Sequence, residues 1–208
     1  DINQQNWFKP SKKKPYDLQK IEFIPKNRPA LNGEIEKGVF IESEDMFFGS
    51  FEDETFSADA ATITINGVIA HPGYAKDTLV NAIKIAGAVL DALPKNEWSP
   101  ETTEKREGFV HPVAVNGIAE KTTIQFIVRD FTVDGLMAHH NRLKMIAEEV
   151  VAKYPGASME YKEQEQYRNM KEILDKHPQV AAYAEEAIKR AGLTVIKESI
   201  RGGTDGSR

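Results

Sequence analysis

The clearest pattern in the chain is a regular alternation of apolar and polar residues that begins near residue 58. Ala61, Ile63 and Ile65 are separated by threonines, and this period of two predicts a half-buried strand. From Asp77 to Leu93 the apolar spacing changes to steps of three and four, which predicts an amphipathic helix that stops at Pro94. The residues expected on its buried face are Leu79, Ile83, Ala86 and Leu90.

The same two periods recur further along the chain. Strands are predicted at Phe109–Asn116 and Thr122–Phe131, joined as a hairpin, and a second helix at about Val133–Lys153. A fourth strand is predicted at Ser158–Gln166. The order β-α-β-β-α-β predicts a ferredoxin-like α+β fold, in which two helices cover one face of a four-stranded antiparallel sheet.

The two ends of the chain have different patterns. A helix over Pro178–Ala191 and a strand over Leu193–Ile200 have the rhythm of an α/β domain, and we expect them to be part of one. The first 45 residues predict a mostly irregular arm with one short strand near Ile21–Ile24. We therefore expect three parts: a divergent N-terminal segment (1–49), a ferredoxin-like domain (50–166) and a partial α/β domain (167–208).

Composition narrows the class of protein. The 208 residues have a net charge of −5 and contain no cysteine. This charge argues against a nucleic-acid-binding protein, and the central strands lack the sequence pattern of an RNA-binding module with this topology. No apolar run approaches the ~18 residues of a membrane span. The absence of cysteine fits a reducing compartment, so we expect a cytoplasmic protein with no nucleic-acid or membrane partner.

The histidines and acidic residues give few candidates for a metal site. His139 and His140 are adjacent on a predicted helix, so their side chains point about 100° apart and cannot share one metal ion. We interpret both as exposed helix residues, and His177 as part of a helix start. An acidic stretch is interpreted as a solvated loop; its members are Glu42, Glu44, Asp45, Glu52, Asp53 and Glu54.

Three residues are candidates for substrate chemistry. His71 lies on a Pro-Gly turn between a strand and a helix, where its imidazole either donates a hydrogen bond to a developing oxyanion or simply caps the turn. Arg129 lies at a strand end, where its guanidinium either binds a substrate carboxylate or forms an ion pair with Asp130 or another sheet neighbour. Asn81 either binds a polar substrate group or is a surface residue of the helix.

The chain closes on a glycine-rich turn, Arg201 to Arg208, whose backbone N–H groups can approach a ligand closely. Together with five other motifs, this turn makes the chain resemble peptidase T, the tripeptide aminopeptidase branch of the di-zinc metallopeptidase superfamily that includes aminoacylase. The motifs are Thr55-Phe56-Ser57-Ala58-Asp59, Ala70-His71-Pro72-Gly73-Tyr74-Ala75-Lys76, Glu107-Gly108-Phe109-Val110-His111-Pro112, Phe126-Ile127-Val128-Arg129-Asp130-Phe131, Tyr167-Arg168-Asn169-Met170 and Arg201-Gly202-Gly203-Thr204-Asp205-Gly206.

The resemblance covers about residues 50–208 and implies roles. Members have a zinc-bearing catalytic domain interrupted by a ferredoxin-like lid that dimerises through its sheet. His71 matches the lid histidine that reaches the partner subunit's active site and stabilises the tetrahedral intermediate. Arg129 matches the arginine expected to hold the peptide's C-terminal carboxylate, and Asn81 is a further candidate for substrate contact. Gly203 and Thr204 match a turn that lines the substrate pocket, with Arg201 and Asp205 holding its shape.

The chain also departs from the family's pattern. Residues 1–49 contain none of the expected metal motifs, and the late metal-binding histidine would lie beyond Arg208. We therefore expect a fragment or truncated member of a zinc-dependent tripeptide aminopeptidase that binds small peptides and forms a homodimer. By itself it is expected to be inactive, with no metal ligand of its own and no tightly bound zinc. The alternative is a non-catalytic dimerisation module.

Overall fold

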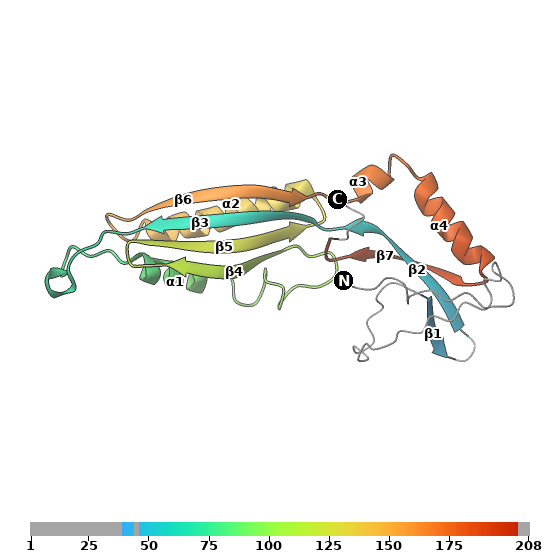
Figure 1. The fold of residues 1–208 in the computed structure, drawn as a ribbon, viewed down its shortest axis with the longest axis horizontal. Coiled ribbons are helices and arrows are strands. Elements are labelled where there is room, and N and C mark those ends of the chain that lie inside the picture. Colours follow the sequence, from blue (N-terminus) through green and yellow to red (C-terminus); the bar gives the residue numbers. More distant parts are fainter. Residues whose placement is uncertain (1–38, 44–45, 204–208) are drawn as a thin grey trace, which may run out of the picture. The chain divides into compact units, whose positions relative to one another are not determined.

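The computed structural model describes residues 39–43 and 46–203. Within them the chain divides into two compact units, each treated by itself below. The larger unit comprises residues 54–170 together with the turn that follows residue 199. Elements of the two units are labelled in Figure 1.

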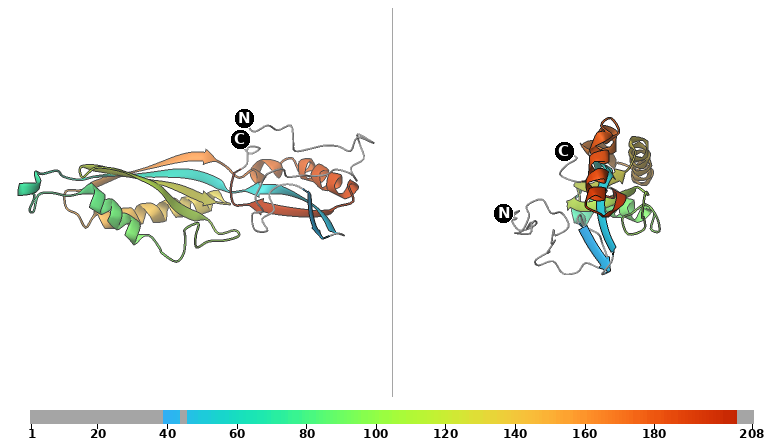
Figure 2. Two further views of the ribbon diagram at one scale, coloured as in Figure 1. Left: turned by 60° about the horizontal axis from the view of Figure 1, so that its bottom comes forward. Right: turned by 90° about the vertical axis from the view of Figure 1, so that its right-hand side faces the viewer.

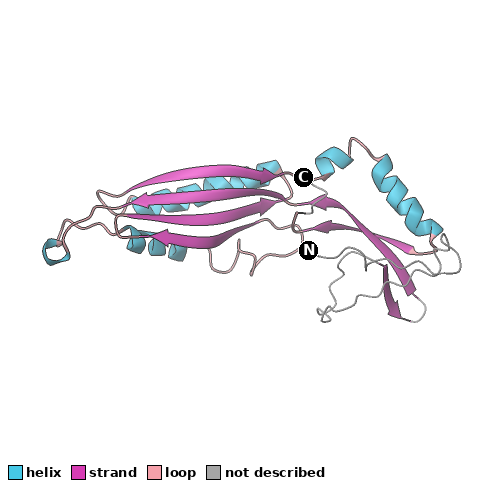
Figure 3. Cartoon of the chain, in the orientation of Figure 1, coloured by secondary structure: helices cyan, strands magenta, loops and turns pink. Residues whose placement is uncertain are grey.

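The larger unit has the predicted ferredoxin-like fold. Its elements follow the order β3 (Ser57–Asn66), α1 (Ala82–Ala92), β4 (Phe109–Gly117), β5 (Lys121–Asp130), α2 (Val133–Val151) and β6 (Ser158–Tyr167). The strands form an antiparallel sheet in the order β4-β5-β3-β6, shown as neighbouring magenta arrows in Figure 3. Both helices lie on the same face of this sheet (Figure 2). The fold class predicted from the sequence is therefore confirmed.

The core of this unit lies between the two helices and the sheet. Alternate β3 residues, Ala61, Ile63 and Ile65, are fully buried against the helices, as their spacing predicted. On the sheet's other side no helix covers the strands within the described residues. The α2 stripe contributes Leu136, Leu143 and Val150 to the same core. Burial of these side chains is the main favourable term for the unit, at about 25 cal/mol per Å² of apolar surface.

The first helix differs from the prediction. It begins at Ala82 rather than Asp77, because the Asn81 side chain caps it and residue 80 pairs in extended form with residue 68. Its buried face is consequently Ala82, Ile85, Ala86 and Val89. Leu79 and Ile83, which the sequence pattern placed in the core, are instead 37% and 50% exposed.

The prediction for the adjacent histidines is wrong. His140 is only 4% exposed, and the side chain of His139 is 17% exposed. His140 follows Leu136 by four residues and precedes Leu143 by three, so it belongs to the buried stripe of α2. Each imidazole has its own hydrogen-bond partners, described below.

The smaller unit contains a three-stranded sheet in the order β1-β2-β7, with β1 at Val39–Ser43, β2 at Met46–Thr55 and β7 at Thr194–Ile200. It also contains α3 (Lys171–Leu174) and α4 (Gln179–Arg190). Helix α4 and strand β7 were predicted, although Ala187, expected toward a core, is exposed. The strand expected near Ile21–Ile24 lies outside the described residues.

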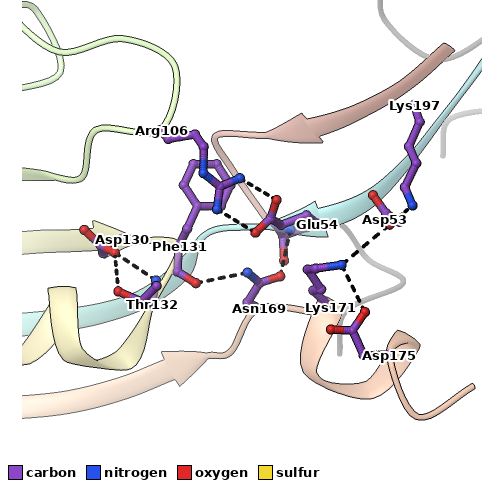
Figure 4. Close-up of polar contacts among 11 residues, drawn as sticks. Asp53, Glu54, Arg106, Asp130, Phe131, Thr132, Asn169, Lys171, Asp175 and Lys197 are labelled. Carbon is purple, nitrogen blue, oxygen red and sulfur yellow. Dashed lines mark hydrogen bonds and ion pairs between the residues drawn. The ribbon is translucent and has the colours of Figure 1, made fainter.

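Strands β1 and β2 were not predicted from the sequence. The acidic stretch that was interpreted as a solvated loop lies partly on β2, where Asp53 is buried and paired with Lys197 at 2.7 Å. Lys171, on α3, lies 4.0 Å from the same carboxylate (Figure 4). The two lysines compensate the buried charge of Asp53, so this residue is tolerated within a strand. A cluster of acidic residues in the sequence therefore does not by itself indicate a loop.

Candidate functional site

The candidate site lies on the helix-free face of the four-stranded sheet, at the end where β3 begins. Four residues form a row across the strands, because Ala58 pairs with Arg129 on one side and Tyr167 on the other, while Arg129 pairs with Phe109. Directly paired residues project to the same face of a sheet. The row therefore presents a guanidinium and a phenol on either side of an alanine methyl group.

The turn Arg201–Gly202–Gly203 crosses this row. Arg129 Nη1 donates to the Arg201 carbonyl at 3.4 Å, and the turn is attached to β3 through the Phe56 N–H and the Ile200 carbonyl at 3.2 Å. A Cβ atom on Gly203 would lie 2.6 Å from Tyr167 Cζ, so a side chain at this position would require the Tyr167 ring to shift.

The side chain of Arg201 holds the turn in place. It donates to the Thr103 carbonyl at 2.6 Å, to Thr103 Oγ1 at 2.9 Å and to the Glu107 carbonyl at 2.9 Å. Its guanidinium also lies over the rings of Phe56 and Phe109. These contacts support the expected role of Arg201 in shaping the turn. Of the other turn residues predicted as site residues, Gly203 lies at the row, and Thr204 and Asp205 lie outside the described residues.

Unpaired polar atoms gather at this site. Among the described residues, the buried side-chain atoms without a hydrogen-bond partner are Arg129 Nε, Arg201 Nε and Tyr167 Oη. Each such atom costs about 1–3 kcal/mol relative to a hydrogen-bonded one. The sequence left open whether Arg129 forms an ion pair with Asp130. In the structure the Asp130 carboxylate pairs with His139 instead. The site therefore has donors to offer to an oxyanion.

A network of short polar contacts supports the strand ends beside the row. Arg106 binds Glu54 through two hydrogen bonds of 2.6 and 2.9 Å and lies over the Phe131 ring (Figure 4). The buried Asn169 side chain accepts from the Thr55 N–H and donates to the Phe131 carbonyl, both at 3.0 Å. These bonds fix the entry to β3 and the exit from β5, and with them the position of Arg129.

Buried His140 and half-buried His139 hold elements of the fold together. Trp98 Nε1 donates to His139 Nδ1 at 2.6 Å, which leaves the Nε2–H of a neutral imidazole to donate to Asp130 at 3.1 Å. Burial alone would raise the pKa of Asp130, but the hydrogen bonds from His139 and Thr132 outweigh it and hold that pKa below its usual value. His140 contacts Asp59 and Tyr161 at 3.2 and 2.7 Å. Burial raises the pKa of Tyr161.

His71 and Asn81 lie at the opposite end of the sheet from Arg129. Strand β3 runs from the row at Ala58 to Asn66, and the loop that follows carries His71. Eight residues of strand span roughly 27 Å. His71 Nδ1 accepts the Gly73 N–H at 3.1 Å, and Asn81 Oδ1 accepts the N–H groups of Ile83 and Lys84. Both side chains are therefore caps, and a neutral His71 that accepts at Nδ1 carries its proton on Nε2.

The described residues do not form a metal site. Nowhere in the ranges 39–43 and 46–203 do three histidine or acidic side chains come close enough to hold one ion. We therefore derive no metal-dependent step from this part of the chain. In the same residues, no helix is long and apolar enough to cross a membrane.

Comparison with known proteins identifies the domain. Residues 54–157 match the family described as the peptidase dimerisation domain. Peptidase T from Exiguobacterium sibiricum is 42% identical over 160 residues, and peptidase T from Clostridium perfringens is 40% identical over the same length. Each alignment covers 77% of this chain and 39% of the relative, so the chain spans about two-fifths of those proteins.

Solved structures show the same fold. Aminopeptidase PepT from Bacillus cereus has a TM-score of 0.64 at 18% identity, covering 83% of this chain and 43% of its own. A tripeptidase from Staphylococcus aureus has a TM-score of 0.60 at 18% identity, covering 76% of this chain and 41% of its own. With the matched fold, the family match over half the chain and the resemblance carried by its motifs, the chain belongs to the peptidase dimerisation domain family and is similar to peptidase T.

Proposed function

We propose that the chain supplies the lid and part of the substrate pocket of a zinc-dependent aminopeptidase that removes the N-terminal residue of tripeptides. The observation that carries this proposal is the Arg129 guanidinium, held on the helix-free face with its Nε unpaired among the described residues. A guanidinium binds a carboxylate through two parallel hydrogen bonds, and the C-terminus of a short peptide provides one. In this proposal the carboxylate reaches Arg129 beside the Gly202–Gly203 backbone, which Arg201 holds next to Arg129 and Tyr167.

In this proposal the zinc ligands do not come from the described residues, which hold no suitable cluster. The relatives that match are longer than the matched region, which is 39% of their length. The chain by itself is consequently expected to bind peptides without hydrolysing them. The domain boundaries at 49/50 and 166/167 and the cytoplasmic location stay predictions.

The two lid residues act on one substrate only if they come from different copies of the chain. His71 and Arg129 lie at opposite ends of a strand that spans roughly 27 Å. An extended tripeptide spans roughly 10 Å. A homodimer resolves this mismatch, with Arg129 from one copy and His71 from its partner.

The sheet edges indicate how the two copies meet. The β6 edge carries Glu160, Lys162 and Glu165, and charged side chains protect an edge from pairing. The β4 edge instead exposes Val113 and Val115, 46% and 47% exposed. The Val110 N–H already donates to the Trp98 carbonyl and a bulge lies at Val113, which leaves residues 114–117 as the regular free edge.

A two-fold axis beside this edge makes the two β4 strands antiparallel. The Phe109 end of one strand then lies beside the Gly117 end of the other. Because Arg129 pairs with Phe109 and the His71 loop is at the Gly117 end, each Arg129 comes to the same end of the dimer as the partner's His71 loop. Two equivalent sites result.

A non-catalytic dimerisation module is the second candidate, favoured by the same apolar edge and by the absence of a metal cluster in the described residues. Peptide binding distinguishes the two. Calorimetry with trialanine and with trialanine amide should show that the free carboxylate strengthens binding about tenfold or more, and that Arg129→Gln removes this difference. Arg190→Gln, an exposed arginine on α4, is the matched control. Equal affinity for both peptides would contradict the peptidase proposal and leave the dimerisation module.

A further inference from the structure

The loop between β3 and α1 presents more than a histidine. Its base is closed by the pairing of Val68 with Val80, through hydrogen bonds of 2.9 and 2.8 Å. Gly67 lies so close to the Val80 carbonyl that no Cβ fits there, and its N–H donates to the Glu120 carbonyl at 2.7 Å. The loop beyond this base is therefore presented from a fixed support rather than from a free hinge.

At the tip of this loop a short 3₁₀ turn, Pro72–Tyr74, couples two aromatic side chains. The Tyr74 N–H donates to the His71 carbonyl at 2.8 Å, and Thr78 Oγ1 donates to the Tyr74 carbonyl at 3.3 Å. The ring centroids of His71 and Tyr74 lie 5.6 Å apart. The position of the Tyr74 side chain is therefore coupled to that of the His71 imidazole.

The Tyr74 side chain has little protein around it. It is 83% exposed, and Ile69 in the same loop is 60% exposed. Single exposed apolar residues are ordinary, but an exposed aromatic ring coupled to a histidine on a fixed turn, with an exposed isoleucine in the same loop, offers a small contact surface.

We propose that Tyr74 is a specificity-determining residue that each copy supplies, beside His71, to the peptide site of its partner. This inference rests on the proposed dimeric peptidase. Since the two rings are within 6 Å, Tyr74 lies against the residue next to the peptide bond that His71 faces. A phenol ring offers a flat apolar surface, so it favours peptides with apolar or aromatic side chains at that position over glycine.

The test places a photo-cross-linker at this position. p-Benzoylphenylalanine is incorporated in place of Tyr74 in the 208-residue chain, and the cross-linked products are mapped by mass spectrometry. We expect a cross-link between two copies that ends near Arg129 or in residues 200–203. The same cross-linker in place of Met145, which is 52% exposed on α2 over the other face of the same sheet, is the control and should not reach those residues.

Competition tests the specificity. Trileucine should suppress the Tyr74-site cross-link at a concentration about tenfold below that of triglycine, the discrimination that apolar pockets give. Equal suppression by both peptides, or by neither, overturns the assignment. A dimer by light scattering whose cross-link maps elsewhere also overturns it, while the proposed dimer stands. A monomer at all concentrations sinks the proposed dimeric site and this inference with it.

Discussion

His140 Nε2 lies 3.2 Å from Asp59 Oδ2, in the interface between α2 and the sheet. Asp59 also accepts from Arg168 Nη1 at 2.6 Å, and the hydroxyl of Tyr161 lies 2.7 Å from the other ring nitrogen of His140. One buried imidazole thus joins the helix layer to β3 and β6. Histidine is a common metal ligand, but His140 has a structural role here.

Replacing His140 by alanine is expected to lower the free energy of unfolding of the lid by about 2–4 kcal/mol, because Asp59 and the Tyr161 hydroxyl lose a buried partner. Urea unfolding followed by far-UV circular dichroism measures the change. His177→Ala, at an exposed position, is the control and should change the value by less than about 0.5 kcal/mol. A small effect at His140 would mean that the network contributes little.

Two glycine substitutions should act in opposite directions. A Cβ on Gly67 would lie 2.2 Å from the Val80 carbonyl oxygen and 2.8 Å from that of Ala119, and both are backbone atoms that cannot turn away. Gly87 lies on the exposed side of α1, and its added Cβ meets nothing within 4 Å. Gly67→Ala should therefore lower stability by more than about 2 kcal/mol, while Gly87→Ala should raise it by about 1 kcal/mol.

Thermal and urea unfolding of the two variants give the comparison, since both replace the same hydrogen by the same methyl group. The Gly67→Ala variant should also lose protection from hydrogen exchange at Val68 and Val80, whose N–H groups close the loop base. Unchanged exchange at those two amides would show that the loop base is more plastic than its packing indicates.

Features that depend on neighbouring residues could be predicted from the sequence, whereas features that depend on contacts between distant segments could not. The alternation at Ala61, Ile63 and Ile65 predicted β3 because a strand's two faces are encoded by neighbouring residues. The predicted helix began too early because Leu79, four residues before Ile83, continues the helical spacing backward past the cap at Asn81. The burial of His140 was detectable, since it follows Leu136 on the apolar stripe.

The candidate site also combines features that the sequence shows locally with features that it does not. Arg129 and Gly203 were proposed as site residues from their motifs, yet nothing local in the sequence showed that Tyr167 flanks the same alanine as Arg129. That relationship depends on the register between β3 and β6, which the sequence does not encode within one segment. Tyr74 was visible in its motif, but its exposure depends on how the loop is closed.

Acid should destabilise the lid in part through Asp130. Its pKa is held below the ordinary value in the folded state by His139 and Thr132, against the opposing effect of burial. A carboxyl group of this kind stabilises the fold above its unfolded pKa of about 3.9 and loses that contribution as the pH falls through the folded value. In Asp130→Asn the decrease in stability below about pH 4 should be smaller than in the unaltered chain. Glu120→Gln, an exposed carboxyl, is the control, and an identical pH profile for all three proteins would contradict the assignment.

Asn169 joins two strand ends beside the proposed peptide site. Its side chain accepts from the Thr55 N–H and donates to the Phe131 carbonyl, and it is 5% exposed. Asn169→Asp keeps the acceptor and the shape, but it sets a carboxylate oxygen against the Phe131 carbonyl and buries a charge, whereas Asn169→Ala removes the donor and the acceptor together. We expect losses of about 3–5 kcal/mol for Asn169→Asp and about 2–3 kcal/mol for Asn169→Ala, measured by urea unfolding. Arg129 lies two residues before Phe131, so the hydrogen bonds of Asn169 can also fix the position of Arg129. If they do, both variants should weaken trialanine binding under conditions where they remain folded. Weakened stability with unchanged peptide affinity would show instead that the strand ends are held independently of the Arg129 side chain.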